Sequence, residues 1–328
     1  MHRLKLAKYA RNLVANAKEL RLAMTILVRD EADIIESNIR FHACQGVDCF
    51  AVMDNNSRDG TSEILKRLSQ EFDLHVIRQP DNNYQQAKWM TELAFYARDH
   101  LKADLVISND ADEFWMPSEG TSLKDHLRKS DSVVTINRKN MVLDHSSKKK
   151  TYRFFDASYV VESPINYSTS FQRSSIHASI ILARISPKVI VNPYGLIRIK
   201  GGNHRAKHLW KFLNARSEPN ITVYHYPIRG YYQFEANIRN RQTLLNTTNA
   251  AMGSHYKRWV SILEEGQLSE EYESMILSEE DIKSTQRLGI TVLNPSIGER
   301  LRNVLNAPIF PSTEQIISES EALVPKAE

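Results

Sequence analysis

Two aspartates separated by a single residue form the strongest chemical signal in the sequence. Asp110 and Asp112 lie in the run Asn109-Asp110-Ala111-Asp112-Glu113, one residue after the apolar residues Leu105, Val106 and Ile107. Hard divalent cations such as Mg²⁺ and Mn²⁺ prefer carboxylate oxygens and keep coordination positions open for substrate phosphates. The pattern therefore predicts that Asp110 and Asp112 bind Mg²⁺ or Mn²⁺ together with a phosphate-containing substrate.

Two further polar segments follow apolar runs. The first is Val28-Arg29-Asp30-Glu31, and the second is Asp54-Asn55-Asn56-Ser57-Arg58-Asp59-Gly60-Thr61. Asn, Asp, Ser and Gly also form ordinary turns, and Asp59 or Thr61 can cap the helix that follows. Residue types alone leave both a turn and a binding loop open for the second segment.

The elements that carry these segments alternate in type. Apolar runs predict strands at residues 23–28, 49–53, 74–77 and 104–108, and helical spacing predicts helices at 31–43, 61–72 and 85–100. Strands separated by helices of this length indicate right-handed βαβ units and an α/β fold with a mainly parallel central sheet. Ligands bind beyond the carboxyl ends of such strands, and all three polar segments fall there.

The remainder of the chain is less regular. It predicts strands at 133–136 and 179–183, a short strand with a Pro-Tyr-Gly turn within 188–199, a helix at 231–245, and a helical C-terminal extension and tail over 246–328. Residues 1–22 are basic and carry an apolar stripe at helical spacing. We expect this N-terminal helix to pack on the domain; peripheral contact with an anionic membrane surface is the alternative.

Composition restricts the class of protein. The 328 residues are 41% hydrophobic and 25% charged, with a formal net charge of +4. No apolar run approaches the ~18 residues of a membrane span, no signal peptide is visible, and two cysteines are too few for a disulfide scaffold. We expect a cytoplasmic protein, with the inner face of the membrane as the alternative location. The small net charge and the lack of a recognised motif argue against a nucleic-acid partner.

Competing nucleotide-binding motifs are missing from the sequence. It contains neither G-x-G-x-x-G nor G-x-x-x-x-G-K-[ST], which argues against a Rossmann dehydrogenase and a P-loop NTPase. The glycine-rich loop with Arg and Lys that opens sugar nucleotidyltransferases is also lacking after the first predicted strand.

Taken together, the three polar segments resemble those of a family 2 glycosyltransferase with the GT-A fold. Asp-Ala-Asp-Glu-Phe at residues 110–114 resembles a bacterial branch of that family. The likeness continues through Gly202-Asn203-His204, His225-Tyr226-Pro227-Ile228-Arg229 and Tyr232-Gln233-Phe234. It covers residues 23–245, which would divide into a nucleotide-sugar half at 23–130 and an acceptor half at 131–245.

The resemblance implies inverting transfer of a sugar from a UDP-, GDP- or dTDP-linked donor to an acceptor hydroxyl, in bacterial surface-glycan synthesis. It implies a dependence on Mn²⁺ or Mg²⁺, with His225 or His204 as a further ligand beside Asp110 and Asp112. The residues expected to bind the nucleotide sugar are Val28, Arg29, Glu31, Asp54, Asn56, Lys88, Asp110 and Arg229.

One departure from the family pattern concerns the helix after Phe234. Relatives often have a lysine three residues after this aromatic position, where the chain has Asn237. Arg239 or Arg241 could take its place.

A stretch without carboxylates lies in the second half of the chain. From Ser163 to Ser217 there is no Asp or Glu, while nine Lys or Arg residues occur. A solvated face is one interpretation; the other is an electropositive wall that faces the donor diphosphate or an anionic acceptor such as an acidic glycan. Inversion by direct displacement needs a carboxylate base, which must lie outside this stretch. The first candidates are Glu162 and Asp156, followed by Glu218 and Asp144.

Two other functions remain open from the sequence. A sugar nucleotidyltransferase could use the same kind of sheet, although its glycine-rich loop is missing. A non-catalytic nucleotide-sugar-binding protein would share the binding residues but would release no nucleotide.

Overall fold

The computed structural model describes residues 20–81, 84–166, 179–247 and 253–306. The helix predicted at 1–22 falls almost wholly outside these residues, as does the tail from Pro311. Among the described residues, no helix combines the length and apolar character needed to cross a membrane.

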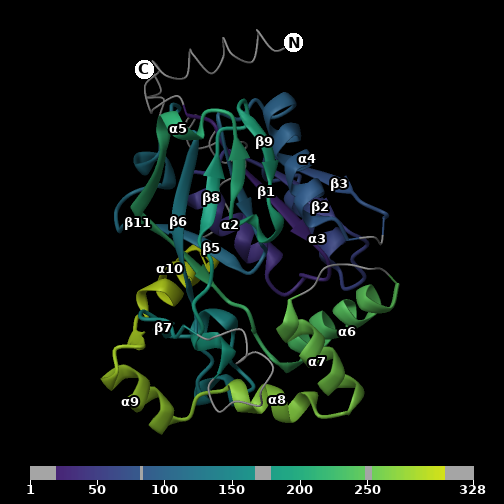
Figure 1. Ribbon diagram of the computed structural model, residues 1–328, viewed down its shortest axis with the longest axis vertical. Coiled ribbons are helices and arrows are strands. Elements are labelled where there is room, and N and C mark those ends of the chain that lie inside the picture. Colours follow the sequence, from purple (N-terminus) through teal and green to yellow (C-terminus); the bar gives the residue numbers. More distant parts are fainter. Residues whose placement is uncertain (1–19, 82–83, 167–178, 248–252, 307–328) are drawn as a thin grey trace, which may run out of the picture.

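An eight-stranded sheet forms the centre of the molecule (Figure 1). Its strand order is β3-β2-β1-β4-β8-β6-β11-β5. The strands are β1 (Leu22–Val28), β2 (Cys49–Asp54), β3 (Leu74–Arg78), β4 (Leu105–Asn109), β5 (Glu113–Pro117), β6 (Val133–Asn140), β8 (Lys188–Val191) and β11 (Ala215–His225). Six of them run in one direction, and only β8 and β5 are reversed. The predicted α/β class with a mainly parallel sheet is confirmed.

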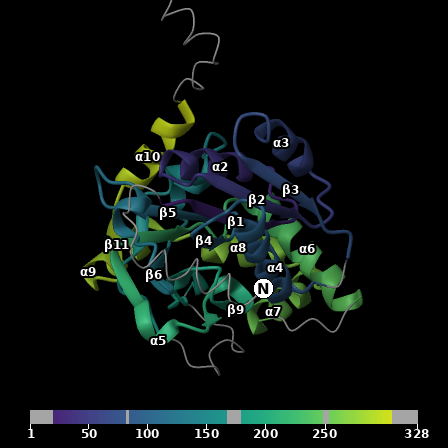
Figure 2. The same ribbon diagram turned by 90° about the horizontal axis from the view of Figure 1, so that it is seen from above.

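Helices cover both faces of the sheet because its first strands are apolar on both sides. Met24 and Ile26 of β1 join the core beneath α2 (Ile35–Cys44) and α3 (Thr61–Leu68), whereas Ala23 joins the core beneath α4 (Gln86–Asp99). Figure 2 shows α2 and α3 on one side of β1 and β2, with α4 on the other. Continuous burial of this kind is typical of parallel strands between helical layers.

A third core lies under the C-terminal helices. It joins α6 (Tyr231–Thr247), α7 (Ser254–Glu264), α8 (Leu268–Met275) and α9 (Glu279–Arg287) to apolar residues that follow β6. These helices gather beyond one end of the sheet in Figure 1. Strand β12 (Thr291–Leu293) pairs with β7 (Tyr159–Val161), and α10 (Ser296–Asn306) returns to pack near α2. The predicted helical C-terminal extension is therefore confirmed for the described part.

Three segments differ from the sequence prediction. Residues 179–183, predicted as a strand, contain a 3₁₀ turn at Ile180–Leu182. Residues 188–199 form two strands, β8 and β9 (Leu196–Ile199); β9 leaves the main sheet to pair with β10 (Ala206–His208). The short helix α5 (Lys211–Asn214) then precedes the 11-residue strand β11, which ends at His225.

A buried polar network holds the turn between β4 and β5. Asn38 of α2 donates from Nδ2 to the carbonyls of Ala111 at 2.8 Å and Glu113 at 2.9 Å. His42, one turn later, donates from Nδ1 to the Asn38 carbonyl at 2.8 Å and accepts at Nε2 from the Trp115 backbone at 3.0 Å. Trp115 in turn donates to Asn109 at 2.7 Å. The network fixes the position of the residues between the two strands.

The same network predicts a specific acid sensitivity. Burial lowers the pKa of His42 to about 3, because the ring lies where a charge cannot be hydrated. The unfolded chain takes up a proton near the ordinary histidine pKa of about 6.5, whereas the folded chain does not. The contribution of neutral His42 to the free energy of unfolding is thus fully present above pH 6.5 and is lost as the pH falls toward 3. Between pH 7 and 5 the loss is about 2 kcal/mol.

We therefore expect His42→Gln to be less stable than wild type at pH 7 but to lose about 2 kcal/mol less on acidification to pH 5. His145→Gln, at an exposed position, is the matched control and should follow wild type. Urea unfolding at both pH values measures this. An equal loss in all three proteins would contradict the role given to His42.

Candidate active site

The loop after β2 is tied to itself and to the end of β1. Asp54 is buried at the end of β2, where its Oδ1 accepts from the Ser57 backbone at 3.0 Å and its Oδ2 accepts from the Ser62 hydroxyl. Asn56 has a left-handed backbone (φ 58°) and donates to the Pro80 carbonyl at 2.9 Å. The Val28 carbonyl accepts from the Asn55 backbone at 2.9 Å. The loop after β2 thus forms a turn, and it also lies against the end of β1, where the first polar segment begins.

Arg229 joins the first polar segment to the second half of the chain. Its guanidinium donates to Asp33 at 2.6 Å and to Glu31 at 2.7 Å, although nearly 200 residues separate these partners in sequence. Burial raises the pKa of Glu31 to about 8. The charge of Arg229 acts to lower this pKa, and the charges of Asp112 and Asp33 act to raise it. Arg229 is itself buried, and its Nη1 has no partner.

A buried lysine stands between two carboxylates of the Asp-x-Asp-Glu run. Lys188 of β8 is fully buried; its Nζ pairs with Asp110 and lies 3.0 Å from Glu113. Glu113 also pairs with Arg138 at 2.5 Å, and Asp110 accepts from Asn203 at 3.0 Å. Both carboxylates are therefore already engaged by cations or amides.

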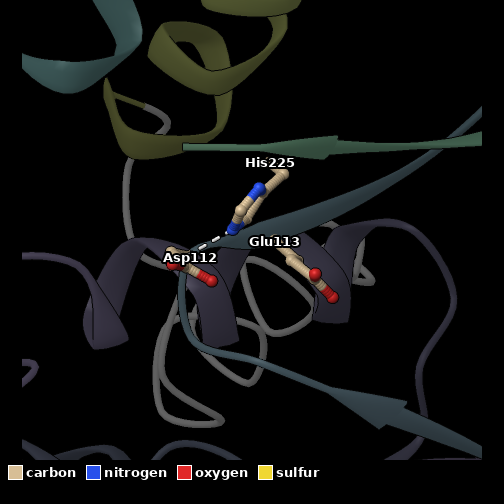
Figure 3. A group of neighbouring side chains, drawn as sticks. All are labelled: Asp112, Glu113 and His225. Atoms are coloured by element: carbon tan, nitrogen blue, oxygen red, sulfur yellow. Dashed lines mark ion pairs between the residues drawn. The ribbon is translucent and has the colours of Figure 1, made fainter. Parts of the chain in front are cut away.

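Asp112 faces a different partner. Its carboxylate lies 3.4 Å from Nε2 of His225, which is the last residue of β11. The opposite ring nitrogen, Nδ1, donates to Asn140 at 2.7 Å, and the Tyr226 backbone donates to the Asp112 carbonyl at 2.9 Å. Figure 3 shows the His225 ring pointing toward Asp112, while Glu113 projects in another direction.

These contacts determine the ionisation of Asp112. Burial alone would raise its pKa, but the charge and hydrogen bond of His225, with Arg229 and Lys188, hold the pKa well below its usual range. Asp112 is therefore an ionised carboxylate facing an imidazole nitrogen. One ligand atom each from Asp112, Glu113 and His225 lies within 4.8 Å of the other two.

The donor set fits a divalent cation, although not with every predicted ligand. Asp112 and His225 converge, and the bond to Asn140 orients the ring so that Nε2 can coordinate, as partners behind metal-bound histidines do. Asp110 and Glu113 are instead compensated by Lys188. His204 hydrogen-bonds the Pro187 carbonyl at 3.0 Å and lies outside the group; burial, with Lys188 and Arg138, lowers its pKa to about 4.

Of the two arginines considered on the helix after Phe234, Arg241 is near this site. Its guanidinium lies 4.8 Å from the ring centre of Tyr256 and 5.5 Å from that of Tyr84. Burial would lower its pKa, but the two phenols and Asp110 raise it overall. Arg239 is exposed and pairs with Glu235 at 2.6 Å. Lys88 is exposed on α4 and makes no ion pair within the described residues.

The two base candidates have different surroundings. Glu162 follows β7, is 45% exposed and pairs with Lys139 at 2.6 Å. It lines a cleft of about 630 Å³ that also includes Asn140, the partner of His225. Asp156 pairs with Arg302 of α10 at 2.8 Å and caps a 3₁₀ turn; it is not among the residues that line the cleft. Glu218 pairs with Arg216, and Asp144 caps another such turn.

Comparison with known proteins assigns the central part of the chain. Residues 35–183 match the family described as Glycosyl transferase family 2. This part of the chain belongs to that family. The matched residues include the Asp110–Glu113 run and the first two base candidates, Glu162 and Asp156, whereas His225 and Arg241 lie beyond them.

Solved structures give weaker likenesses. The S. aureus TarS 1-349 complex with UDP-GlcNAc is 12% identical with a TM-score of 0.38, over 74% of this chain and 70% of that one. The complex with UDP is 14% identical with a TM-score of 0.37, over 74% and 69%. Glucosyl-3-phosphoglycerate synthase from Mycobacterium tuberculosis is 18% identical with a TM-score of 0.27, over 37% and 46%. No curated protein matches the chain. The family assignment rests on the sequence match alone.

Four side chains of this candidate site were not singled out from the sequence. They are Lys188, Asn203, Asn140 and Arg138, which bind the carboxylates or His225. Lys188 had a signal: it opens the apolar run Lys188-Val189-Ile190-Val191, and a lysine within a buried strand requires a counter-charge. Arg138 and Asn140 lie on β6 and Asn203 follows β9, so their contacts depend on long-range packing that the sequence does not show.

The Lys188 pairs predict a large loss of stability when the cation is removed. Lys188→Met leaves Asp110 and Glu113 partly uncompensated in a buried site, which should lower the free energy of unfolding by about 3–5 kcal/mol. Lys207→Met, at an exposed lysine of β10, is the control. Adding Glu113→Gln to Lys188→Met should restore part of the loss, since it removes a buried charge. Urea unfolding measures all four proteins; a Lys188→Met protein as stable as wild type would contradict the assignment.

Proposed function

We propose that the chain transfers a sugar, with inversion at the anomeric carbon, from a nucleotide diphosphate sugar to an acceptor hydroxyl. The observation that carries the proposal is the approach of Asp112 to His225 at the carboxyl end of β4, beside the cation Arg241. It occurs in a chain whose residues 35–183 match glycosyltransferase family 2. Phosphate ligands bind at this end of parallel strands.

A divalent cation would be held by Asp112 and His225, with the ring oriented by Asn140. When bound, the cation supplies Lewis-acid stabilisation of the charge that develops on the leaving diphosphate. A set with one imidazole and one carboxylate supports Mn²⁺ over Mg²⁺, which prefers oxygen ligands alone. Asp110 remains a proposed ligand only if it separates from Lys188, so we assign it first to the donor ribose.

The rest of the proposed donor site combines the residues predicted from the sequence with the contacts that these residues make in the structure. Val28, Arg29 and the buried Asp54 are proposed to border the nucleoside, with Glu31 fixed by Arg229. Arg29 has a buried Nε without a partner, which supports a role toward a ligand. Arg241 is proposed to bind the diphosphate in place of the missing lysine, and Lys88 is the second cation within the predicted site.

Glu162 is proposed as the general base. It is the only carboxylate among the described residues that line the cleft, and it forms an ion pair with Lys139 at 2.6 Å. An acceptor hydroxyl would give its proton to Glu162 while its oxygen attacks the anomeric carbon. The bond from that carbon to the diphosphate oxygen breaks on the opposite face.

Several wider assignments remain proposals. They are the domain limits at 23–245, a place in bacterial surface-glycan synthesis, the cytoplasmic location, and contact of residues 1–22 with a membrane surface. A sugar nucleotidyltransferase is disfavoured because no glycine-rich loop follows β1.

The activity can be tested without knowledge of the acceptor. The chain should release nucleoside diphosphate from one member of a UDP-, GDP- and dTDP-sugar panel in the presence of Mn²⁺, slowly with water alone and faster with an acceptor mixture. A non-catalytic binding protein would bind the donor and release nothing, and a nucleotidyltransferase would instead release pyrophosphate or sugar phosphate.

Replacement of the base should separate turnover from donor binding. Glu162→Gln keeps the size of the side chain but cannot accept the proton, so kcat should fall by roughly 10²-fold or more while donor affinity is unchanged. Asp156→Asn is the comparison and should keep most of its activity. Rates at wild-type level for Glu162→Gln would make Glu162 a surface acid and return the role to Asp156.

Replacement of the two arginines of α6 should have unequal effects. Arg241→Gln removes a charge-assisted contact and should weaken nucleoside diphosphate binding by about tenfold. Arg239→Gln removes a charge from the same helix but from an exposed ion pair, so affinity should hardly change. Calorimetric titration gives both constants. Equal affinities for the two variants would exclude Arg241 from the diphosphate site.

A further inference from the structure

The cleft beside Glu162 is strongly cationic. It lies between the end of β6, the segment after β7 and residues 183–187. Among the described residues, its charged lining consists of Arg138, Lys139 and Arg184 against the single carboxylate Glu162. Its volume of about 630 Å³ falls within the range of small-molecule sites.

The three cations differ in how far they are already neutralised. Lys139 is paired with Glu162, and Arg138 with the buried Glu113. Arg184 is exposed and has no ion pair within the described part of the chain, although its backbone is held by Ile165, whose carbonyl accepts at 2.9 Å. The guanidinium of Arg138 also retains an unused hydrogen-bond donor, because its Nε is buried without a partner.

The cleft also adjoins the group expected to hold the metal. Asn140 lines it and accepts the Nδ1 proton of His225, so one hydrogen bond connects the cleft lining to His225. Glu162 lies on the same lining. A molecule in the cleft would therefore meet the proposed base and would be separated by the Asn140 side chain from His225, the proposed metal ligand.

We propose that this cleft binds an acceptor carrying an anionic group, a carboxylate or a phosphate, and that Arg184 is the residue that selects it. This inference rests on the proposed glycosyl transfer and adds the substrate class to it. A neutral acceptor would leave the unpaired guanidinium without a partner, whereas an anion forms a charge-assisted, two-point contact with it. Arg184 is a specificity residue here and takes no part in the chemical step.

The test uses three probes that differ in one group: glucose 6-phosphate, glucuronate and glucose. Each is titrated into the full chain saturated with Mn²⁺ and the tightest-binding of UDP, GDP and dTDP, so that the donor phosphate site is already filled. At least one anionic probe should bind about tenfold more tightly than glucose, and the stronger of the two identifies phosphate or carboxylate.

Variants then assign the preference to the cleft. Arg184→Gln should weaken binding of the anionic probe by about five- to tenfold and leave the affinities for glucose and the nucleoside diphosphate unchanged. Arg184→Lys should retain part of the affinity for the anionic probe. Arg198→Gln is the matched control, an exposed arginine of β9 outside the cleft. Rising salt should reduce the preference.

The outcomes separate this inference from the proposed function. Equal binding of charged and neutral probes would overturn it, as would an Arg184→Gln protein that loses nucleoside diphosphate affinity instead of probe affinity. A chain that binds none of the three nucleoside diphosphates would contradict the proposed function itself.

Discussion

The charge balance around Lys188 decides what the other side chains of the site can do. A fully buried ammonium is tolerated only beside carboxylates, and Lys188 has two, Asp110 and Glu113. Because both are compensated, Asp112 is the member of the Asp-x-Asp-Glu run that stays available for another partner. Its partner in this structure is His225. The acidic run thus divides into two carboxylates that pair with Lys188 and one, Asp112, that faces His225.

The fold places these groups by means of long-range polar contacts. Asn38 of α2 holds the turn that carries Ala111, and Arg229 holds Glu31 and Asp33 from the far end of the domain. Asn140 aligns the ring of His225. Each contact joins segments far apart in sequence, so the site exists only when the second half of the chain has packed on the first.

The sequence predicted the parallel half of the fold well because local rules apply there. Apolar runs and helical spacing located β1, β2, β3 and β4, and the strand-end rule placed Asp54 and Asp110 at one edge. Prediction was weaker where pairing depends on distant partners: the strand β5 begins within the acidic run itself, and residues 179–183 looked like a strand but form a 3₁₀ turn.

The same limit applied to the site. Asp112 and His225 could be named as metal candidates from residue type, but nothing in the sequence distinguished His225 from His204, or Arg241 from Arg239. Those choices depend on which face of β11 or α6 turns toward the sheet edge. Lys188 was counted among the cations of a carboxylate-free stretch, although its apolar neighbours indicated burial.

The central claim is that Asp112 and His225 hold a divalent cation, and Mn²⁺ titration tests it most directly. Calorimetry is run with Mn²⁺ in the presence of the nucleoside diphosphate, on wild type, Asp112→Asn, His225→Gln and Asp73→Asn. Asp73 is an exposed control at the opposite edge of the sheet, where it precedes β3 and pairs with the half-buried Arg21. We predict that the first two variants lose at least about tenfold in Mn²⁺ affinity and that Asp73→Asn does not. Unchanged Mn²⁺ binding in Asp112→Asn, or full transfer activity in excess EDTA, would contradict the account.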